Sequence, residues 1–370
     1  MTQYILQSVL LGCVLSIFAR RNGKFNTYQI LFALIWTIAV IGLKVIYGDN
    51  QITFYSNDQQ IQLEILNKIE TIGLNFSIND AIDNRYLILI PVWFLKLFGI
   101  QPILALKFLQ AICLTTIYRV CSDYLTANNL KVKLYQAIFY SGPLFIFLSI
   151  LGLRDLEIAL GATYFFIGKS TNLRIVSLLV TIFLRPHLAV ALIFGWLVTK
   201  YIERFKIKQV YMMLLAVVIS SFIIGSYVYL TAKYLRPGIQ TNSQQVFSQD
   251  AWWRLFANFL GLQFLTFGDD VVQMSVSQLI LLRLFFVDTF LIPILFVITL
   301  LRDRNRYMFM QMQVLSTFVF FLGIVAQTNF NSSRQNLPFL AAMGVLALLG
   351  FVEPEPNNPD SISKKRLRFK

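Results

Sequence analysis

The chain has 370 residues, of which 57% are hydrophobic and only 14% are charged, and its mean hydropathy is +0.65. Such a chain has more apolar surface than a water-soluble core can enclose, which excludes an ordinary soluble enzyme and predicts a polytopic membrane protein. The net charge of +14 does not indicate nucleic-acid binding, because the basic residues lie between apolar runs and in a short tail rather than on one polar face.

The first apolar run, Tyr4 to Ala19, has no basic residue before it and is followed by Arg20 and Arg21. A signal peptide has the opposite order of charges, so we expect this run to be a retained membrane helix.

Apolar runs continue along the whole chain and predict an all-α protein with about eleven transmembrane helices. The predicted crossings lie near residues 4–19, 28–47, 102–118, 134–151, 154–168, 173–186, 187–200, 209–231, 279–301, 308–328 and 337–352. The run 86–98 is also apolar, but it is short and contains Pro91 and Lys96. We interpret it as a re-entrant or interfacial helix at the outer face.

Lysines and arginines indicate which side each connecting segment faces, because cytoplasmic loops carry an excess of them. If the run 86–98 does not cross, twenty of the 32 basic residues fall on one side and ten on the other. This distribution predicts an outer N-terminus and a cytoplasmic C-terminus. Counting 86–98 as a crossing fits worse, because it places Arg20, Arg21 and Lys24 on the same side as Arg154.

We expect one membrane domain, residues 1–352, followed by a basic cytoplasmic tail, residues 353–370. Two large segments are predicted to face outward. Segment 48–85 is mildly acidic, with six acids against two bases. Segment 232–278 contains an aromatic-rich stretch that suits a helix lying in the outer interface or a packed re-entrant helix.

The segment 151–200 is where we expect the functional site. Its apolar runs hold about 10 to 13 residues each, whereas a helix needs about 20 to cross a bilayer. They reach nearly spanning length only if Arg154 and the turn formed by Arg185, Pro186 and His187 lie within membrane depth. Ionisable residues in that position are costly, and by default they mark a functional site.

Arginines at the outer ends of predicted crossings are candidates for binding a diphosphate. The guanidinium group is a planar, permanently charged fork that matches phosphate oxygens two at a time. Alternatively, each arginine extends to the interface or pairs with a nearby acid. The candidates are Arg154, Arg185, Arg236 and Arg334.

His187 is the only histidine in the chain. Because proline is favoured at the first position of a helix, the sequence Arg185, Pro186, His187 predicts a new helix whose N-terminus faces outward. A helix N-terminus beside an arginine attracts anions. His187 is therefore a candidate catalytic or substrate-binding residue, and the alternative is a purely structural role.

No metal or cofactor site is indicated by the sequence. One histidine cannot form a metal cluster with others, and the adjacent pair Asp269 and Asp270 need not converge on one ion. We expect a metal-independent protein without a cofactor, whose chemistry uses arginines and carboxylates at the outer face. Asp288, about two turns inside a crossing, is either a buried neutral acid or a partner for an arginine on another helix.

A set of features distributed over most of the chain carries a family resemblance. It comprises about a dozen helices, an outer cap after the second one, a long outer loop before the last three, and three short motifs. The motifs are GLRDLEIAL at 152–160, FLRPHLAVAL at 183–192 and SSRQNLPF at 332–339. In these features the chain resembles the bacterial polysaccharide polymerases of the Wzy and EpsG-like kind.

The resemblance implies a GT-C-like integral-membrane glycosyltransferase at the outer face of the inner membrane. Such an enzyme joins oligosaccharide repeat units carried on undecaprenyl diphosphate into an O-antigen or exopolysaccharide. Its partners would be this lipid-linked oligosaccharide, membrane lipid and, as candidates, a chain-length regulator and a flippase, with no nucleic acid. The site residues carried over are Arg154, Arg185, His187 and Arg334.

The residues fit this reaction chemically. The acceptor hydroxyl must lose a proton while the donor sugar loses a diphosphate, so the site needs a base and fixed positive charge. Asp155, Glu157 and His187 are the candidate bases, and the arginines supply the charge.

Other functions remain open from the sequence. A transferase that uses a polyprenyl-phosphate donor, or an O-antigen ligase, would use a similar outer face. A flippase or permease would need a polar path through the membrane, and most of the predicted crossings lack charges.

Overall fold

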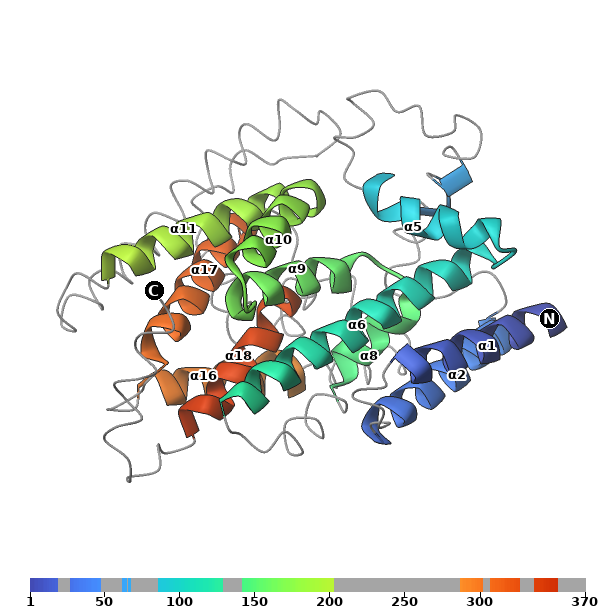
Figure 1. Cartoon of the computed structure of the whole chain (residues 1–370), viewed down its shortest axis with the longest axis horizontal. Coiled ribbons are helices and arrows are strands. Elements are labelled where there is room, and N and C mark those ends of the chain that lie inside the picture. Colours follow the sequence, from blue (N-terminus) through green and yellow to red (C-terminus); the bar gives the residue numbers. More distant parts are fainter. Residues whose placement is uncertain are drawn as a thin grey trace, which may run out of the picture.

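The computed structural model describes residues 1–18, 27–47, 62–64, 66–67, 86–128, 142–202, 287–301, 307–326 and 336–351. Every regular element within these residues is helical, which confirms the all-α class. The helices are α1 (Thr2–Phe18), α2 (Thr27–Tyr47), α5 (Tyr86–Leu97), α6 (Pro102–Ala127), α8 (Pro143–Leu151), α9 (Asp155–Ile167), α10 (Thr171–Leu184), α11 (Pro186–Ile202), a π-helical turn (Val287–Leu291), α16 (Ile292–Leu300), α17 (Met308–Ala326) and α18 (Leu337–Phe351), and Figure 1 shows their arrangement.

Helix boundaries differ from the predicted crossings where polar residues continue a helix. The crossing predicted to end near residue 118 belongs to α6, which continues to Ala127. Asn128 follows it, and its side-chain amide donates to the carbonyl of Tyr124 at 2.8 Å. Hydropathy locates the apolar part of a helix, whereas backbone hydrogen bonding and capping decide where the helix ends.

Polar contacts show which helix ends lie together. The side-chain amide of Gln7, in α1, donates to the carbonyl of Gly99 at 2.7 Å and accepts from the N–H of Gln101 at 3.1 Å. The starts of α1 and α6 therefore lie together, and we call this side of the molecule the Gln7 end. On the opposite side, the Tyr307 hydroxyl donates to Oδ1 of Asn128 at 3.1 Å, and we call this side the Asn128 end.

Helix α5 lies beside the start of α6. Helices α1 and α2 are antiparallel, because Lys44 lies over the ring of Tyr4 and a Cβ on Gly12 would meet Thr37. The chain thus returns to the Gln7 end before α5 begins, and α6 starts from that same end. Helix α5 packs against α6 there (Figure 1). The interpretation of residues 86–98 as a re-entrant or interfacial outer-face helix stays a prediction.

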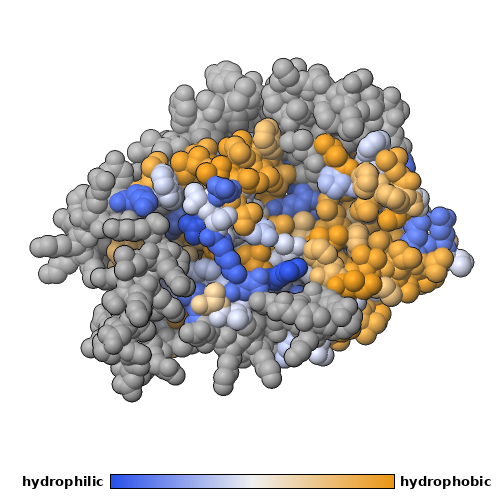
Figure 2. Space-filling model, viewed as in Figure 1, coloured by the Kyte–Doolittle hydropathy of each residue, from blue (hydrophilic) through white to orange (hydrophobic). Residues whose placement is uncertain are grey.

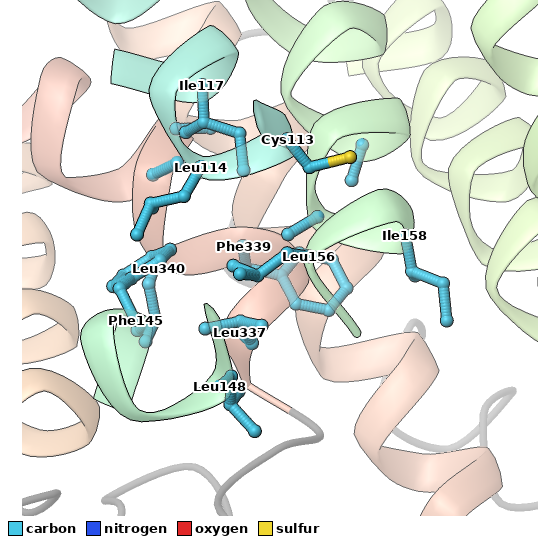
Figure 3. Packing of buried hydrophobic residues seen from close by; sticks show 14 of the residues in the cluster. Cys113, Leu114, Ile117, Phe145, Leu148, Leu156, Ile158, Leu337, Phe339 and Leu340 are labelled. Atoms are coloured by element: carbon cyan, nitrogen blue, oxygen red, sulfur yellow. The ribbon is translucent and has the colours of Figure 1, made fainter. Parts of the chain in front are cut away.

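The core lies between α6, α8, α9 and α18. Figure 3 shows side chains from all four helices gathered in one cluster, including Leu114, Phe145, Leu156 and Leu340. These side chains are at most 1% exposed. Helix α18 is therefore enclosed by the rest of the bundle, and α9 is fixed by contacts with both α6 and α18.

Among the described residues, two helices, Thr27–Ile46 and Pro102–Ala127, are long and apolar enough to cross a membrane, which gives weak support for a membrane location. Six further helices in the described segments are apolar but have only 10–17 residues. Large apolar side chains are also exposed: on α10, Val176 is 55% and Leu179 is 50% exposed. Figure 2 shows apolar side chains over much of the coloured surface.

A glycine forms the sharp turn between α8 and α9. Gly152 has φ +76°, in the left-handed region that side chains other than glycine rarely adopt. A Cβ at this position would also lie 3.0 Å from the backbone nitrogen of Lys107 and 3.1 Å from Cβ of Leu106. The turn therefore brings the start of α9 directly against α6.

We predict that Gly152→Ala destabilises the protein by about 1–2 kcal/mol or more, because the left-handed backbone disfavours a Cβ and α6 leaves no space for one. Gly42→Ala is the matched control, since a Cβ there would meet nothing within 4 Å. Thermal unfolding of the purified proteins in detergent measures the stability of both variants. Equal melting temperatures for the two variants would contradict the prediction.

Candidate functional site

The first turn of α9 carries three of the predicted site residues. Arg154 occupies the N-cap position, and Asp155 and Glu157 lie in the first turn. Carboxylates are stabilised there, because unpaired backbone N–H groups give a helix N-terminus a partial positive charge. Asp155 is buried, with 4% of its surface exposed. The turn at Gly152 places this acidic turn of α9 beside α6.

Gln110, in α6, holds the start of α9 in place. Its Nε2 donates to Oε1 of Glu157 at 2.7 Å, and its Oε1 accepts from the backbone N–H of Leu156 at 3.2 Å. Gln110 is only 1% exposed, so water does not compete for these bonds. One side chain thus satisfies a backbone donor at the helix start and fixes the orientation of the Glu157 carboxylate.

Helix α11 begins at Pro186, as the sequence predicted, and two functional candidates meet at this turn. Nε of Arg185 donates to Nε2 of His187 at 3.1 Å. Both side chains pack on Phe321 of α17: the imidazole stacks at 5.7 Å between centroids with an interplanar angle of 10°, and the guanidinium carbon lies 5.4 Å from the ring centroid. Phe321 therefore supports a rigid pair of a cation and an imidazole.

The bond from Arg185 decides how His187 can act. Because Nε2 accepts this bond, a neutral imidazole carries its proton on Nδ1. Acting as a base through Nε2 would require breaking the bond to Arg185. The geometry is better suited to a histidine that positions Arg185 than to a histidine that removes a proton.

Helices α9 and α10 form an antiparallel hairpin that brings the two groups of candidates to one side. Arg174 donates through Nε to the carbonyl of Gly168 at 3.2 Å near the closed end of the hairpin. Further along it, a Cβ on Gly161 would lie 2.8 Å from the hydroxyl of Thr181. The start of α9 and the end of α10 therefore lie together, away from Gly168. Arg154 and Arg185 share this side of the hairpin, at the Gln7 end.

Two of the predicted arginines, Arg236 and Arg334, lie outside the described residues, as does the pair Asp269 and Asp270. The described chain resumes at Asn336, at the start of α18. Here Phe339 packs on Phe321 with 5.5 Å between ring centroids, so the start of α18 adjoins the ring that supports Arg185.

Asp288 has a structural role in the described contacts. Its carboxylate accepts a hydrogen bond of 2.8 Å from the backbone N–H of Leu144, in the first turn of α8. Helix α8 has no side-chain cap from its own N-cap residue, Gly142, so this carboxylate from another segment takes that place. The bond identifies Asp288 as a helix cap.

Sequence reasoning missed Gln110 and Lys107. Lys107 is fully buried in α6, three residues before Gln110. A signal for it was present, because it is a charged residue inside an apolar run, which by default marks a functional site. Gln110 gave no comparable signal, since an uncharged amide in a helix does not indicate which neighbour it will bind.

Within the described segments, no group of three or more His, Cys, Asp and Glu side chains is placed to hold a metal ion. Comparison of the chain with protein-family models, with curated proteins and with solved structures found no match.

We predict that Gln110→Leu destabilises the protein by about 1–3 kcal/mol, because it leaves a buried N–H and the Glu157 carboxylate without their partner. Gln101→Leu is the control, since that side chain makes no capping bond at the start of the same helix. In detergent, the free energy of unfolding of the control should lie within about 0.5 kcal/mol of the wild-type value. A stable Gln110→Leu variant would show that the bridge contributes little.

Proposed function

We propose that this protein is an integral-membrane glycosyltransferase that polymerises oligosaccharide repeat units carried on undecaprenyl diphosphate. It would be a multi-pass protein of about eleven crossings in the inner membrane, with its N-terminus outside and its C-terminus in the cytoplasm. The observation that carries the proposal is the shared location of two groups at one end of the α9–α10 hairpin: an arginine with two carboxylates at the start of α9, and the Arg185–His187 pair at the start of α11.

Each group supplies one requirement of the reaction. As the new bond forms between the acceptor oxygen and the anomeric carbon, the hydroxyl proton passes to a base. The bond from that carbon to the diphosphate breaks, and the diphosphate leaves with the electron pair. Glu157 is the base that the geometry favours, because a 2.7 Å hydrogen bond from Nε2 of Gln110 fixes the orientation of its carboxylate. The arginines stabilise the negative charge that develops on the leaving group.

His187 serves in this proposal as a positioning residue. It accepts from Arg185, and Phe321 supports both side chains. A guanidinium group held in this way is ready to bind phosphate oxygens without first losing side-chain freedom, and such preorganisation is what electrostatic stabilisation of a leaving group requires.

The arrangement of the helices supports an outer location for these groups. The positive-inside rule assigns the start of α1 to the outside, and the bonds from Gln7 place the start of α6 on the same side. Gly152 lies against residues 106 and 107, near the start of α6. The acidic turn of α9 therefore belongs to the side that we assign to the outer face, where lipid-linked repeat units are joined.

Deletion of the gene, followed by gel analysis of surface glycolipid, tests the reaction class. We expect the long-chain ladder to be lost while material with a single repeat is retained. Loss of all repeats would indicate an assembly transferase or a flippase instead. Repeats that accumulate without attachment to their final lipid would indicate a ligase.

We predict that Arg154→Lys and Arg185→Lys each reduce polymer formation by roughly 10- to 150-fold, because a lysine cannot form two parallel hydrogen bonds to a phosphate. Arg174→Lys, at the closed end of the same hairpin, should leave polymer formation unchanged. Chain-length distribution and protein level are measured together. Near-normal polymer formation by both Lys variants at normal protein abundance would show that neither arginine binds the diphosphate.

A further inference from the structure

Lys107 is buried in the bundle, and its side chain has no exposed surface. Among the residues that the structure describes, its Nζ has no hydrogen-bond partner. A buried ammonium group without a partner is costly both in a protein interior and in a membrane. The described part of the chain therefore lacks the group that would stabilise this lysine.

The surroundings of Lys107 add a second positive charge. Lys44, in the last turn of α2, is the neighbouring charge that acts on Lys107. The packing of α2 on α6 is consistent with this proximity: Phe32 contacts Tyr118 and Trp36 contacts Phe108, with 6.2 and 6.3 Å between ring centroids. This antiparallel register continues toward the end of α2 and the start of α6, where the two lysines lie.

Tyr4 of α1 lies beside Lys44, whose Nζ is 5.3 Å from the centroid of the Tyr4 ring. The Tyr4 hydroxyl is buried and has no hydrogen-bond partner among the described residues. A phenol hydroxyl and an ammonium group are both donors that an anion with several oxygens can satisfy at once.

We propose that Lys107, Lys44 and Tyr4 form a binding site for a phosphate group between α1, α2 and α6 at the Gln7 end. Phosphate is the ligand class because it supplies negative charge beside two lysines and has acceptor oxygens for Lys107 Nζ and the Tyr4 hydroxyl. The site is separate from the Arg185–His187 pair, and it does not depend on the reaction proposed above. Since Nζ is covered in the present structure, binding requires the surrounding side chains to move apart, and a bound phosphate would stabilise the rearranged state.

The opposing explanation is an uncharged lysine that fills space in the core. The two explanations differ in what replacement by methionine does, because methionine has a similar length and is apolar. If Lys107 only fills space, Lys107→Met keeps the affinity for anions and is at least as stable as wild type. If Lys107 anchors a phosphate, Lys107→Met loses affinity.

The test uses the full-length protein, purified in an uncharged detergent and freed of lipid. Dissociation constants and shifts in melting temperature are measured, after incubation to equilibrium, for inorganic pyrophosphate, geranylgeranyl diphosphate and phosphatidylglycerol. Geranylgeraniol, which has no phosphate, is the ligand control. Binding of pyrophosphate would identify a site for free phosphate, and binding of only the two lipids would identify a lipid headgroup site.

For any phosphate compound that binds, we expect roughly 10- to 150-fold weaker binding to Lys107→Met, the loss expected when one charged hydrogen bond is removed. Lys200→Met, which replaces an exposed lysine in α11, should bind as wild type does. Tyr4→Phe removes one hydroxyl and should weaken binding several-fold. It decides the test if Lys107→Met does not fold.

The proposal is overturned if none of the three phosphate compounds binds to wild type. It is also overturned if Lys107→Met binds them as tightly as Lys200→Met does. If only Tyr4→Phe can be purified, an unchanged affinity of that variant for the phosphate compounds also overturns the proposal.

Discussion

The bridge from Gln110 to the start of α9 is the interaction on which the candidate site depends. Helix α9 begins after a turn of only a few residues, and its first N–H groups need partners that the helix itself cannot supply. The side-chain oxygen of Gln110 accepts from one of these N–H groups, that of Leu156, and its side-chain nitrogen donates to the Glu157 carboxylate. Because the same side chain makes both bonds, the direction of the helix and the orientation of the carboxylate are set together. Gly152 makes this possible by allowing the close approach to α6.

The Arg185–His187 pair is held by a different kind of contact. The imidazole stacks on Phe321, and the guanidinium carbon of Arg185 lies 5.4 Å from the centroid of the same ring. The same ring packs on Phe339, and Phe339 packs on Phe318 and Phe166, so the support extends through α17, α18 and α9. The ring quadrupole of Phe321 attracts the guanidinium cation on its face.

Much of the fold was predictable from sequence because it depends on local patterns. Apolar runs located the described helices, and the proline after Arg185 marked the start of α11. The bridge from Gln110 and the burial of Lys107 were not predictable, because helical spacing identifies a face of a helix but not the neighbour that it meets. Asp288 illustrates the same limit: the sequence placed it inside a predicted crossing, but its role as a cap for α8 is visible only in the packing.

The backbone of α6 connects the two sets of charged residues at the Gln7 end. Gly152 packs against residues 106 and 107 of this helix, and Lys44 of α2 is a neighbouring charge that acts on Lys107. Three residues further along, Gln110 holds Glu157. A movement of Lys107 toward an anion would therefore act on the same turn of α6 that supports the start of α9. Because packed helices shift between discrete arrangements rather than deforming continuously, occupancy of the Lys107 site and the orientation of Glu157 are expected to be coupled.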